Sequence, residues 1–282
     1  MKILLAVPNL NYGKFLTKCL ASLESQTIEV DVVIIDGGSS DDSVVIAEKF
    51  CEDKPNWLFI SKPNLSQAAS IRYVFDNFIN NSHEIIGWIN SDDFLLKTRS
   101  LEKVVQIFDS VPDCEVVTLG GVYVDENGTH LRNINYTYHP WLQGDMFRRG
   151  GAFIQPSTFW SAKMEGSYGI NVNLRYTFDA DLFLSFRNNK RQFYIDQNEL
   201  ISAYRLHGQN LSLNIPSRRV CELATLYQKQ LKRPYASLYL KMVYEFFLVL
   251  DRLGFLGRGI KKIYRNVNNF ASYVTVYRIP SI

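Results

Sequence analysis

Short apolar segments rich in valine and isoleucine alternate with amphipathic segments through residues 1–119. The apolar segments have the length of buried strands, and the segments between them carry apolar residues at helical spacing. Strands that alternate with helices in this way predict a mostly parallel sheet with helices on both faces, an α/β fold. The expected strands are 3–7, 30–35, 57–60, 85–89 and 115–119, and the expected helices are 14–25, 44–50, 66–78 and 99–108.

Polar residues directly follow three of these strands, in the segments 8–11, 36–39 and 90–93. Ligands of such sheets bind at the carboxyl ends of the strands, so we expect the three segments to share one edge. Adjacent carboxylates such as Asp92 and Asp93 repel each other and are costly to bury, and they suit a divalent cation that carries phosphates. The alternative is a solvated turn in which one aspartate caps the next helix.

The chain lacks the two common phosphate-binding motifs, Gly-x-Gly-x-x-Gly and Gly-x-x-x-x-Gly-Lys-Ser/Thr. A nucleotide would therefore be held in another way. Asp36 could accept a hydrogen bond from a base or ribose, while a cation on Asp93 neutralises the diphosphate.

Seven segments, in this order along the chain, resemble the nucleotide-sugar-dependent glycosyltransferases of family 2. They are VPNLNYGKFL at 7–16, CLASLESQT at 19–27, VIIDGGSSDDS at 33–43, GWINSDD at 87–93, GGAFIQPSTFW at 150–160, FDADLFL at 178–184 and AYRLHGQNLS at 203–212. Each segment alone is weak evidence, and their common order makes the resemblance specific. The resemblance implies the GT-A fold, a Rossmann-like sheet flanked by helices.

The resemblance also implies roles on the donor side of the site. Asp36 is expected to recognise the base, usually uracil, with Asp92 near the ribose or sugar and Asp93 on the metal. His207 matches a position that can approach the metal or the diphosphate, although a lone histidine is more often structural. Arg205 could instead face the donor phosphates, because a guanidinium suits oxyanions. The other positions expected on the donor side are Pro8, Asn9, Asn11, Gln67 and Asn90.

Two further segments are expected to serve the acceptor and the chemistry. The acceptor-side positions are Gln155, Pro156, Ser157 and Trp160, and the aromatic residues Phe153, Phe159 and Trp160 form either a platform for a sugar or part of the core. Asp179 matches the usual general base, and Asp181 is its competitor. If this segment opens a helix, the two side chains point in different directions. The alternative is that both aspartates only cap that helix.

The implied activity is inverting transfer of a hexose or N-acetylhexosamine from a nucleotide-sugar donor, a UDP-sugar by expectation. The acceptor would be a hydroxyl of a glycan or a lipid-linked molecule in surface polysaccharide or glycolipid biosynthesis, with Mn²⁺ or Mg²⁺ as the divalent cation. The alternative is a noncatalytic protein of this fold that binds a nucleotide or a glycan. Nucleotidyl transfer is disfavoured, because it requires a glycine-rich basic loop after the first strand and the chain has PNLNY there.

Charge divides the chain near Pro216. Residues 216–282 hold 12 Lys and Arg against 3 Asp and Glu, a net charge of +9, whereas residues 1–215 have a net charge of −6. We therefore predict a catalytic domain over 1–215 and a basic, mainly helical extension over 216–282, with helices at 220–231 and 235–253. The basic segment 255–265 either lies on an anionic membrane surface or is the solvated face of a helical subdomain.

The expected cellular location rests on signals that are not found in the sequence. The first apolar segment ends at Pro8, too early for a signal peptide, and no apolar run is long enough to span a bilayer. The four cysteines are scattered, which favours free thiols in a reducing compartment. We expect a cytoplasmic protein, with peripheral contact to the inner face of the cell membrane as an open alternative. A nucleic-acid partner is not expected, because the pI is only about 8.5 and no recognition motif is present.

Overall fold

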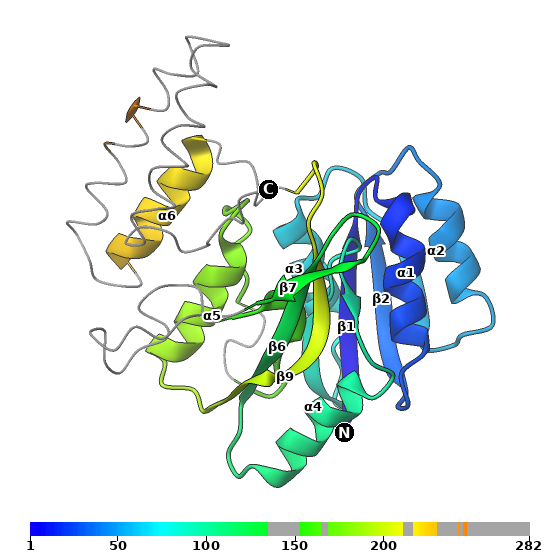
Figure 1. Ribbon diagram of the computed structural model, residues 1–282, viewed down its shortest axis with the longest axis horizontal. Helices are drawn as coiled ribbons and strands as arrows, with labels where there is room; N and C mark the ends of the chain where they lie inside the picture. Colours follow the sequence, from blue (N-terminus) through cyan, green and yellow to red (C-terminus); the bar gives the residue numbers. More distant parts are fainter. Residues whose placement is uncertain (135–152, 165–168, 211–216, 230–241, 243–244, 247–282) are drawn as a thin grey trace. The chain divides into compact units, whose positions relative to one another are not determined.

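The computed structural model describes residues 1–134, 153–164, 169–210, 217–229, 242 and 245–246 (Figure 1). The chain divides into two units. The first comprises Met1–Asn135, Phe153–Asn173 and Asn189–His207, and the second comprises Tyr136–Ala152, Leu174–Asn188 and Gly208–Ile282. The sequence-based boundary near Pro216 stays a prediction.

The first unit is built on one sheet with the strand order β3-β2-β1-β4-β8-β6-β9-β5, and β7 pairs with β6. The strands are β1 Lys2–Asn9, β2 Val30–Asp36, β3 Trp57–Ser61, β4 His83–Trp88, β5 Phe94–Leu95, β6 Val116–Val124, β7 His130–Asn133, β8 Thr158–Ser161 and β9 Phe193–Arg205. Strands β3, β2, β1 and β4 are parallel to one another. Beyond β4 the pairing is mixed, because β8 runs antiparallel to both β4 and β6, while β9 runs parallel to β6.

The structure confirms the α/β fold and the five strands expected from the sequence. Strands β5, β7, β8 and β9 were not expected. Three of these are only two to four residues long, which is too short for a recognisable alternation of apolar and polar residues. Their antiparallel pairs make the second half of the sheet mixed.

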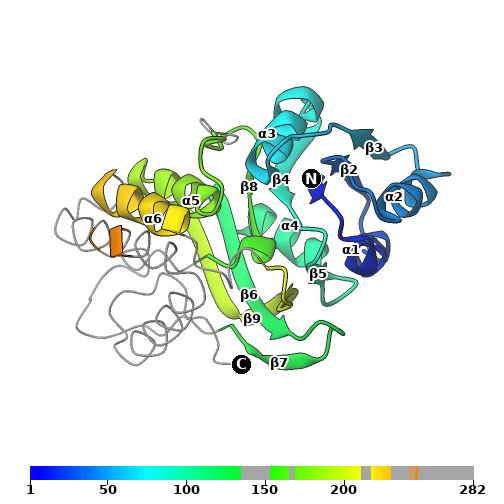
Figure 2. The same ribbon diagram turned by 90° about the horizontal axis from the view of Figure 1, so that it is seen from above.

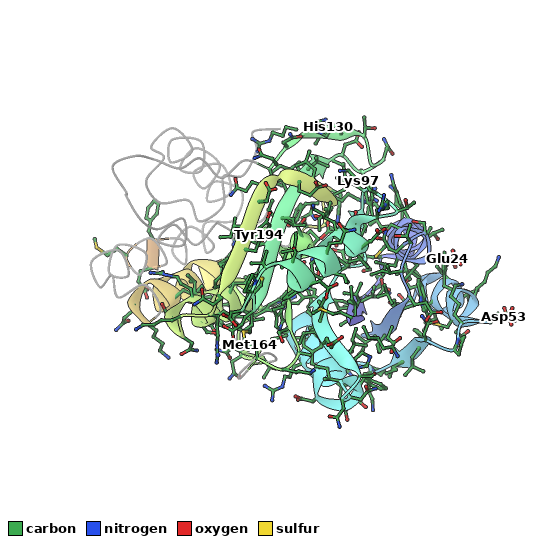
Figure 3. All side chains as sticks on the ribbon, turned by 90° about the horizontal axis from the view of Figure 1, so that it is seen from below. Glu24, Asp53, Lys97, His130, Met164 and Tyr194 are labelled. Atoms are coloured by element: carbon green, nitrogen blue, oxygen red, sulfur yellow. The ribbon has the colours of Figure 1, made fainter. Side chains whose placement is uncertain are left out.

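Helices cover both faces of the parallel strands, as predicted (Figures 1 and 2). The helices of the first unit are α1 Gly13–Glu24, α2 Ser43–Cys51, α3 Gln67–Phe78 and α4 Ser100–Ser110. Helices α1, α2 and α4 share one apolar core with the strands, whose members include Leu5, Val7, Leu16, Leu20, Ile34, Ala47, Ile85, Val104 and Ile107. Helix α3 packs on the other face, where Phe75 meets Trp160 at a ring-centroid distance of 5.9 Å. The exposed side chains include Glu24 at the end of α1 and Asp53 after α2 (Figure 3).

The alternation of side chains along each strand decides which face the polar strand ends occupy. Leu5 and Val7 of β1 belong to the core under α1 and α2, and so does Ile34 of β2. With a period of two, Asn9 and Asp36 lie on that same face, and they are direct neighbours in the register of β1 and β2. The turn after β2 and the start of α1 therefore meet above these two residues.

Asp41 joins the starts of the two helices on this face. Its Oδ1 accepts a hydrogen bond from the backbone N–H of Ser43 at 3.1 Å, and its Oδ2 accepts one from Gly13 at 2.9 Å. A Cβ at Gly13 would lie 3.1 Å from the same carboxylate oxygen. Asp41 thus accepts backbone N–H groups at the amino ends of both α1 and α2.

The second unit contains helices α5, Phe178–Asn188, and α6, Ser217–Lys229, which lie side by side in both ribbon views (Figures 1 and 2). Helix α6 confirms the helix expected at 220–231. The helix expected at 235–253 lies largely outside the described residues, and the basic segment 255–265 lies wholly outside them. Among the helices that are described, none has the length and hydropathy to cross a membrane.

Candidate functional site

Hydrogen bonds join the ends of β1 and β2 into one polar region. The amide nitrogen of Asn9 donates to Asp36 at 2.9 Å and to the Ser39 hydroxyl at 3.1 Å. Asn11 has a left-handed backbone with φ of 57°, which asparagine tolerates better than most residues. Its N–H donates to Ser39 Oγ at 2.8 Å, and its side-chain oxygen accepts from the N–H of Ser40 at 2.7 Å. Asn9, Asn11 and Asp36 are thus brought together, as predicted.

Both carboxylate oxygens of Asp36 are fully engaged. Oδ1 accepts from the side chains of Asn9 and Ser39, and Oδ2 accepts from the backbone N–H groups of Gly38 and Ser39 at 2.9 and 2.8 Å. Burial raises the pKa of Asp36, but the hydrogen bonds from Ser39, Asn9 and Gly38 outweigh it and hold the pKa below its ordinary value. Asp36 therefore orders the loop as a buried anion, and its contact with a nucleotide base stays a prediction. Pro8 precedes Asn9 in β1, where it lies opposite Ile35.

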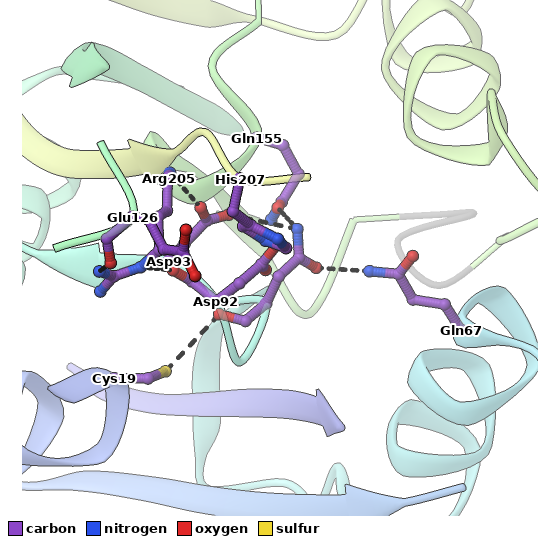
Figure 4. Close-up of polar contacts among 9 residues, drawn as sticks. Cys19, Gln67, Asp92, Asp93, Glu126, Gln155, Arg205 and His207 are labelled. Atoms are coloured by element: carbon purple, nitrogen blue, oxygen red, sulfur yellow. Dashed lines mark hydrogen bonds and ion pairs between the residues drawn. The ribbon is translucent and has the colours of Figure 1, made fainter. Parts of the chain in front are cut away.

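The side chain of Asn90 contacts other segments at the end of β4, among them those of Gln67 and Gln155, which are labelled in Figure 4. Its oxygen accepts from Gln67 of α3 at 2.7 Å, and its nitrogen donates to Gln155 at 3.0 Å. Gln155 in turn donates to the carbonyl of Trp88 at 2.7 Å. On the other side of the turn, the thiol of Cys19 lies 3.6 Å from the Asn90 carbonyl. The Asn90 amide thus connects Gln67, which is expected at the sugar donor, with Gln155, which is expected at the acceptor.

Asp93 is a buried carboxyl group beside a second carboxylate. It is 1% exposed, and its Oδ1 accepts from the backbone N–H of Arg205 at 2.9 Å, while Oδ2 lies 3.3 Å from the amide nitrogen of Asn90. Burial, and next the charge of Asp92, raise the pKa of Asp93 well above its usual range, and the N–H of Arg205 only partly opposes them. A cation at this position would stabilise the ionised form of Asp93.

Asp92 contacts His207 in the structure, a contact that the sequence did not predict. Asp92 Oδ2 and His207 Nε2 are 3.0 Å apart. The imidazole ring packs between two aromatic rings, Tyr12 with centroids 5.4 Å apart and Phe15 with centroids 4.7 Å apart. Burial, and then the charges of Asp92 and Asp93, raise the pKa of Tyr12 to about 12, so its hydroxyl stays protonated at neutral pH. Tyr12 was not among the expected site residues, although it lies inside the segment 7–16.

The guanidinium of Arg205 lies against the acidic turn. Its Nε donates to the carbonyl of Asp92 at 2.8 Å and its Nη1 donates to the carbonyl of Glu126 at 2.7 Å. The group is 4.8 Å from the ring centroid of Phe15 and 5.2 Å from that of Phe94. Arg205 thus holds the Asp92–Asp93 turn in place through both its side chain and its backbone N–H. Its contact with donor phosphates stays a prediction.

The turn between β6 and β7 also reaches this site, which the sequence pattern did not indicate. Glu126 of this turn forms an ion pair with Lys14 in the first turn of α1. The hydrogen bond and the charge of Lys14 lower the pKa of Glu126. Glu126 is distant in sequence from every segment that carries the resemblance, so no local signal could have assigned it.

The expected acceptor residues are buried. Gln155–Ser157 form a short 3₁₀ helix before β8, and the Ser157 hydroxyl donates to the carbonyl of Gly120 at 2.8 Å. Trp160 is fully buried and packs edge to face on Trp88 at a centroid distance of 5.6 Å. The aromatic residues Phe153, Phe159 and Trp160 are all buried. Of the two expectations for them, the structure favours a place in the core over a platform for a sugar. A contact of Gln155, Pro156 or Ser157 with an acceptor stays a prediction.

Asp179 and Asp181 lie in the second unit, in the first turn of α5. The segment opens a helix, so the two side chains point in directions about 160° apart. Asp179 Oδ1 accepts from the N–H of Ala180 at 2.7 Å, and the N–H of Asp181 donates to the carbonyl of Thr177 at 2.9 Å. Their role in catalysis stays a prediction.

Asp93 and His207, the residues expected on a divalent cation, lie at this turn with Asp92 beside them. Within the described part of the chain, no three or more His, Cys, Asp or Glu residues form a complete metal site. Cations at nucleotide sites, however, take one or two carboxylates and complete their shell with phosphate oxygens and water. Carboxylate oxygens and an imidazole nitrogen suit Mn²⁺, and a cation beside buried Asp93 would favour its ionised form. The residues present therefore fit such a cation.

The parallel strands, the mixed second half of the sheet and the acidic turn at the carboxyl edge define a GT-A type of fold. The structure of TarS from S. aureus in complex with UDP-GlcNAc has this fold, with a TM-score of 0.64 at 16% identity, over 82% of this chain and 67% of that one. The mannosyltransferase PcManGT from Pyrobaculum calidifontis has a TM-score of 0.62 at 12% identity, over 97% and 83% of the two chains.

The family follows from the sequence comparison. Residues 5–166 match the model of Glycosyl transferase family 2, and this is more than half of the chain. The protein belongs to this family. The minor teichoic acid biosynthesis protein GgaA of Bacillus subtilis is 25% identical over 210 residues, which are 66% of this chain and 47% of that protein. The chain spans less than half the length of the curated relatives that it matches.

Proposed function

We propose that the protein is an inverting glycosyltransferase. It moves a sugar from a nucleoside diphosphate donor, a UDP-sugar, to a hydroxyl of a glycan or lipid-linked acceptor in surface polysaccharide or glycolipid biosynthesis. The observation that carries this proposal is the group formed by Asp92, Asp93 and His207 at the carboxyl edge of the sheet, beside the ordered Asn9–Asp36 region. A buried carboxyl group with a second carboxylate beside it serves a phosphate-bound cation better than it serves folding.

The relatives support this proposal at different levels of detail. Family membership supports sugar transfer, and GgaA supports a role in making a surface polymer. TarS is described with UDP-GlcNAc, which supports UDP, but PcManGT is described with GDP-Man and Mn²⁺. The donor base is therefore the part of the proposal that most needs a direct test.

The chemistry is a single displacement at the anomeric carbon of the donor sugar. Asp93 and His207 would hold a divalent cation, which would supply positive charge to the departing diphosphate, while Asp92 lies toward the ribose or sugar. Asp179 accepts the proton of the acceptor hydroxyl while the hydroxyl oxygen bonds to the anomeric carbon. The bond from that carbon to the diphosphate oxygen breaks, and the electron pair leaves with the diphosphate. Asp181 is the alternative proton acceptor.

The noncatalytic alternative keeps donor binding but no transfer. The presence of Asp36, Asp93 and Asp179 together favours the enzyme, because a binding protein has no use for a general base. A cytoplasmic location, with membrane contact through segment 255–265, completes the proposal. The net charge of +9 over residues 216–282 supports the membrane contact.

A thermal-shift experiment tests donor binding directly. Wild type, Asp93→Ala and the exposed control Asp109→Ala of α4 are melted with UDP, GDP and UDP-sugars, with and without Mn²⁺. A ligand at about 100 times its Kd adds about 2.7 kcal/mol to the stability of the native state. We expect a Mn²⁺-dependent shift for UDP compounds in wild type and Asp109→Ala, and its loss in Asp93→Ala. A wild type that shifts with no nucleotide would overturn the proposal, and a shift with GDP alone would correct the base.

A further inference from the structure

A glutamate of α6 holds the segment that leads into α5. The carboxylate of Glu222 accepts hydrogen bonds from the backbone N–H groups of Arg175 at 2.9 Å and Tyr176 at 2.8 Å, and from the hydroxyl of Thr177 at 3.2 Å. Glu222 is 6% exposed. These three residues directly precede Phe178, where α5 begins.

The arrangement has physical reasons to be firm. Hydrogen bonds to an ionised carboxylate are shorter and stronger than neutral ones, and a buried carboxylate is stable only when its oxygens are satisfied. A negative charge near the amino end of a helix is also favoured by the helix dipole. Two backbone N–H groups, which would otherwise be unpaired near the start of α5, find their partner in Glu222.

The contact continues directly into the first turn of α5. Thr177, which is fully buried, donates its hydroxyl to Glu222 and accepts the N–H of Asp181 with its carbonyl at 2.9 Å. Asp179 lies in that same turn, one residue beyond Phe178. The position of the backbone that carries Asp179 therefore depends on a side chain of α6.

We propose that Glu222 is a positioning residue for Asp179. By holding residues 175–177 it sets where the first turn of α5 presents the Asp179 carboxylate. This inference rests on the proposed function, because it takes Asp179 as the proton acceptor. It also means that residues beyond Pro216, which the charge pattern predicts as a separate extension, contribute to the transfer step itself. All of the groups involved belong to the second unit.

A purely structural tie between two helices would behave differently under mutation. Glu222→Gln keeps the size of the side chain, but it removes the charge and leaves only one acceptor oxygen for the two N–H groups. If Glu222 positions the base, kcat falls by about 10- to 100-fold while the KM of the donor is unchanged, because a small misplacement of a catalytic group is costly. If it only ties the helices, the melting temperature falls and kcat does not.

The experiment uses the full chain in four forms: wild type, Glu222→Gln, the neighbouring exposed control Cys221→Ser, and Asp179→Asn, together with the double variant of Glu222 and Asp179. Hydrogen exchange at Arg175 and Tyr176 reports the contact without any substrate. We expect faster exchange and lower kcat in Glu222→Gln, with the donor-induced thermal shift retained. We also expect no further loss when Glu222→Gln is added to Asp179→Asn, since both act on one step.

Thr177→Val is a second variant that keeps shape and removes one of the three hydrogen bonds. It should lower kcat less than Glu222→Gln, which keeps the inference testable if Glu222→Gln folds poorly. Wild-type kcat in Glu222→Gln, or losses that add fully in the double variant, would overturn the positioning role alone. A wild type that transfers no sugar from any donor would overturn the proposed function, and the inference with it.

Discussion

Asp36 ends β2 and Asp93 follows β4, the two strands that flank β1. Each residue is 1% exposed, yet the pKa values of the two carboxyl groups are shifted in opposite directions. Asp36 accepts hydrogen bonds on both oxygens from its own loop and Asn9, and its pKa lies below the ordinary value. Asp93 has fewer donors and a second carboxylate beside it, and its pKa lies well above the ordinary value.

The difference lies in how the surroundings compensate the charge of each carboxylate. The donors around Asp36 offset its burial, so its charge stabilises the fold. No such set of donors surrounds Asp93, and its charge is a cost to the metal-free protein. A buried, costly carboxyl group at the ligand edge of a sheet indicates function rather than folding.

The largest expected effect is that of Asp93→Asn. Transfer should fall by about 10²- to 10⁴-fold, because the diphosphate loses several kcal/mol of stabilisation by the cation. The free energy of unfolding in EDTA should stay the same or rise, because the amide removes a buried like charge while its oxygen still accepts from Arg205. Activity assays and urea unfolding measure the two. Strong destabilisation by Asp93→Asn would erase the contrast with Asp36.

Asp36→Asn should act in the opposite direction on stability. The NH₂ of the new asparagine would face either the N–H groups of Gly38 and Ser39 or the Ser39 hydroxyl. In either orientation, groups that donate to Asp36 in the wild type would lose their acceptor oxygen. We expect a loss of about 1–3 kcal/mol in the free energy of unfolding, measured in urea at pH 7. The exposed Asp42→Asn is the matched control and should change it by less than about 0.5 kcal/mol. Equal effects of the two variants would show that the Asp36 bonds contribute nothing.

The smallest expected effect is the pH dependence of this loss. The pKa of Asp36 is lower in the folded protein than the ordinary 3.8, so its stabilisation is fully present above pH 3.8 and disappears as the pH falls through the folded value. The difference in stability between wild type and Asp36→Asn should therefore be constant from pH 7 to about pH 5 and shrink below about pH 4. Urea unfolding at pH 7, 5 and 3 measures it. A difference that grows on acidification would contradict the assignment.

Much of the parallel half of the fold was predictable. The strands from Ile3, Val30 and Ile85 and the helices between them follow from apolar periodicity. The polar strand ends at Asn9 and Asp36 meet as the topology requires, and Asn90 follows β4, the other neighbour of β1. In the mixed half, β6 was predicted, but β5 and β8 were not, because they are too short to carry a pattern and gain their stability from neighbouring strands.

The sequence by itself determined the α/β fold, the acidic turn and the position of its carboxylates at the ligand edge of the sheet. Only the tertiary structure decided how those carboxylates are held. Arg205 reaches Asp93 across 112 residues of sequence, and Glu222 reaches Tyr176 across 46. Periodicity is a local property of the chain, whereas a side chain's hydrogen-bond partners and pKa depend on groups that only the folded chain brings near. The opposite pKa shifts of Asp36 and Asp93 are therefore a property of the tertiary structure.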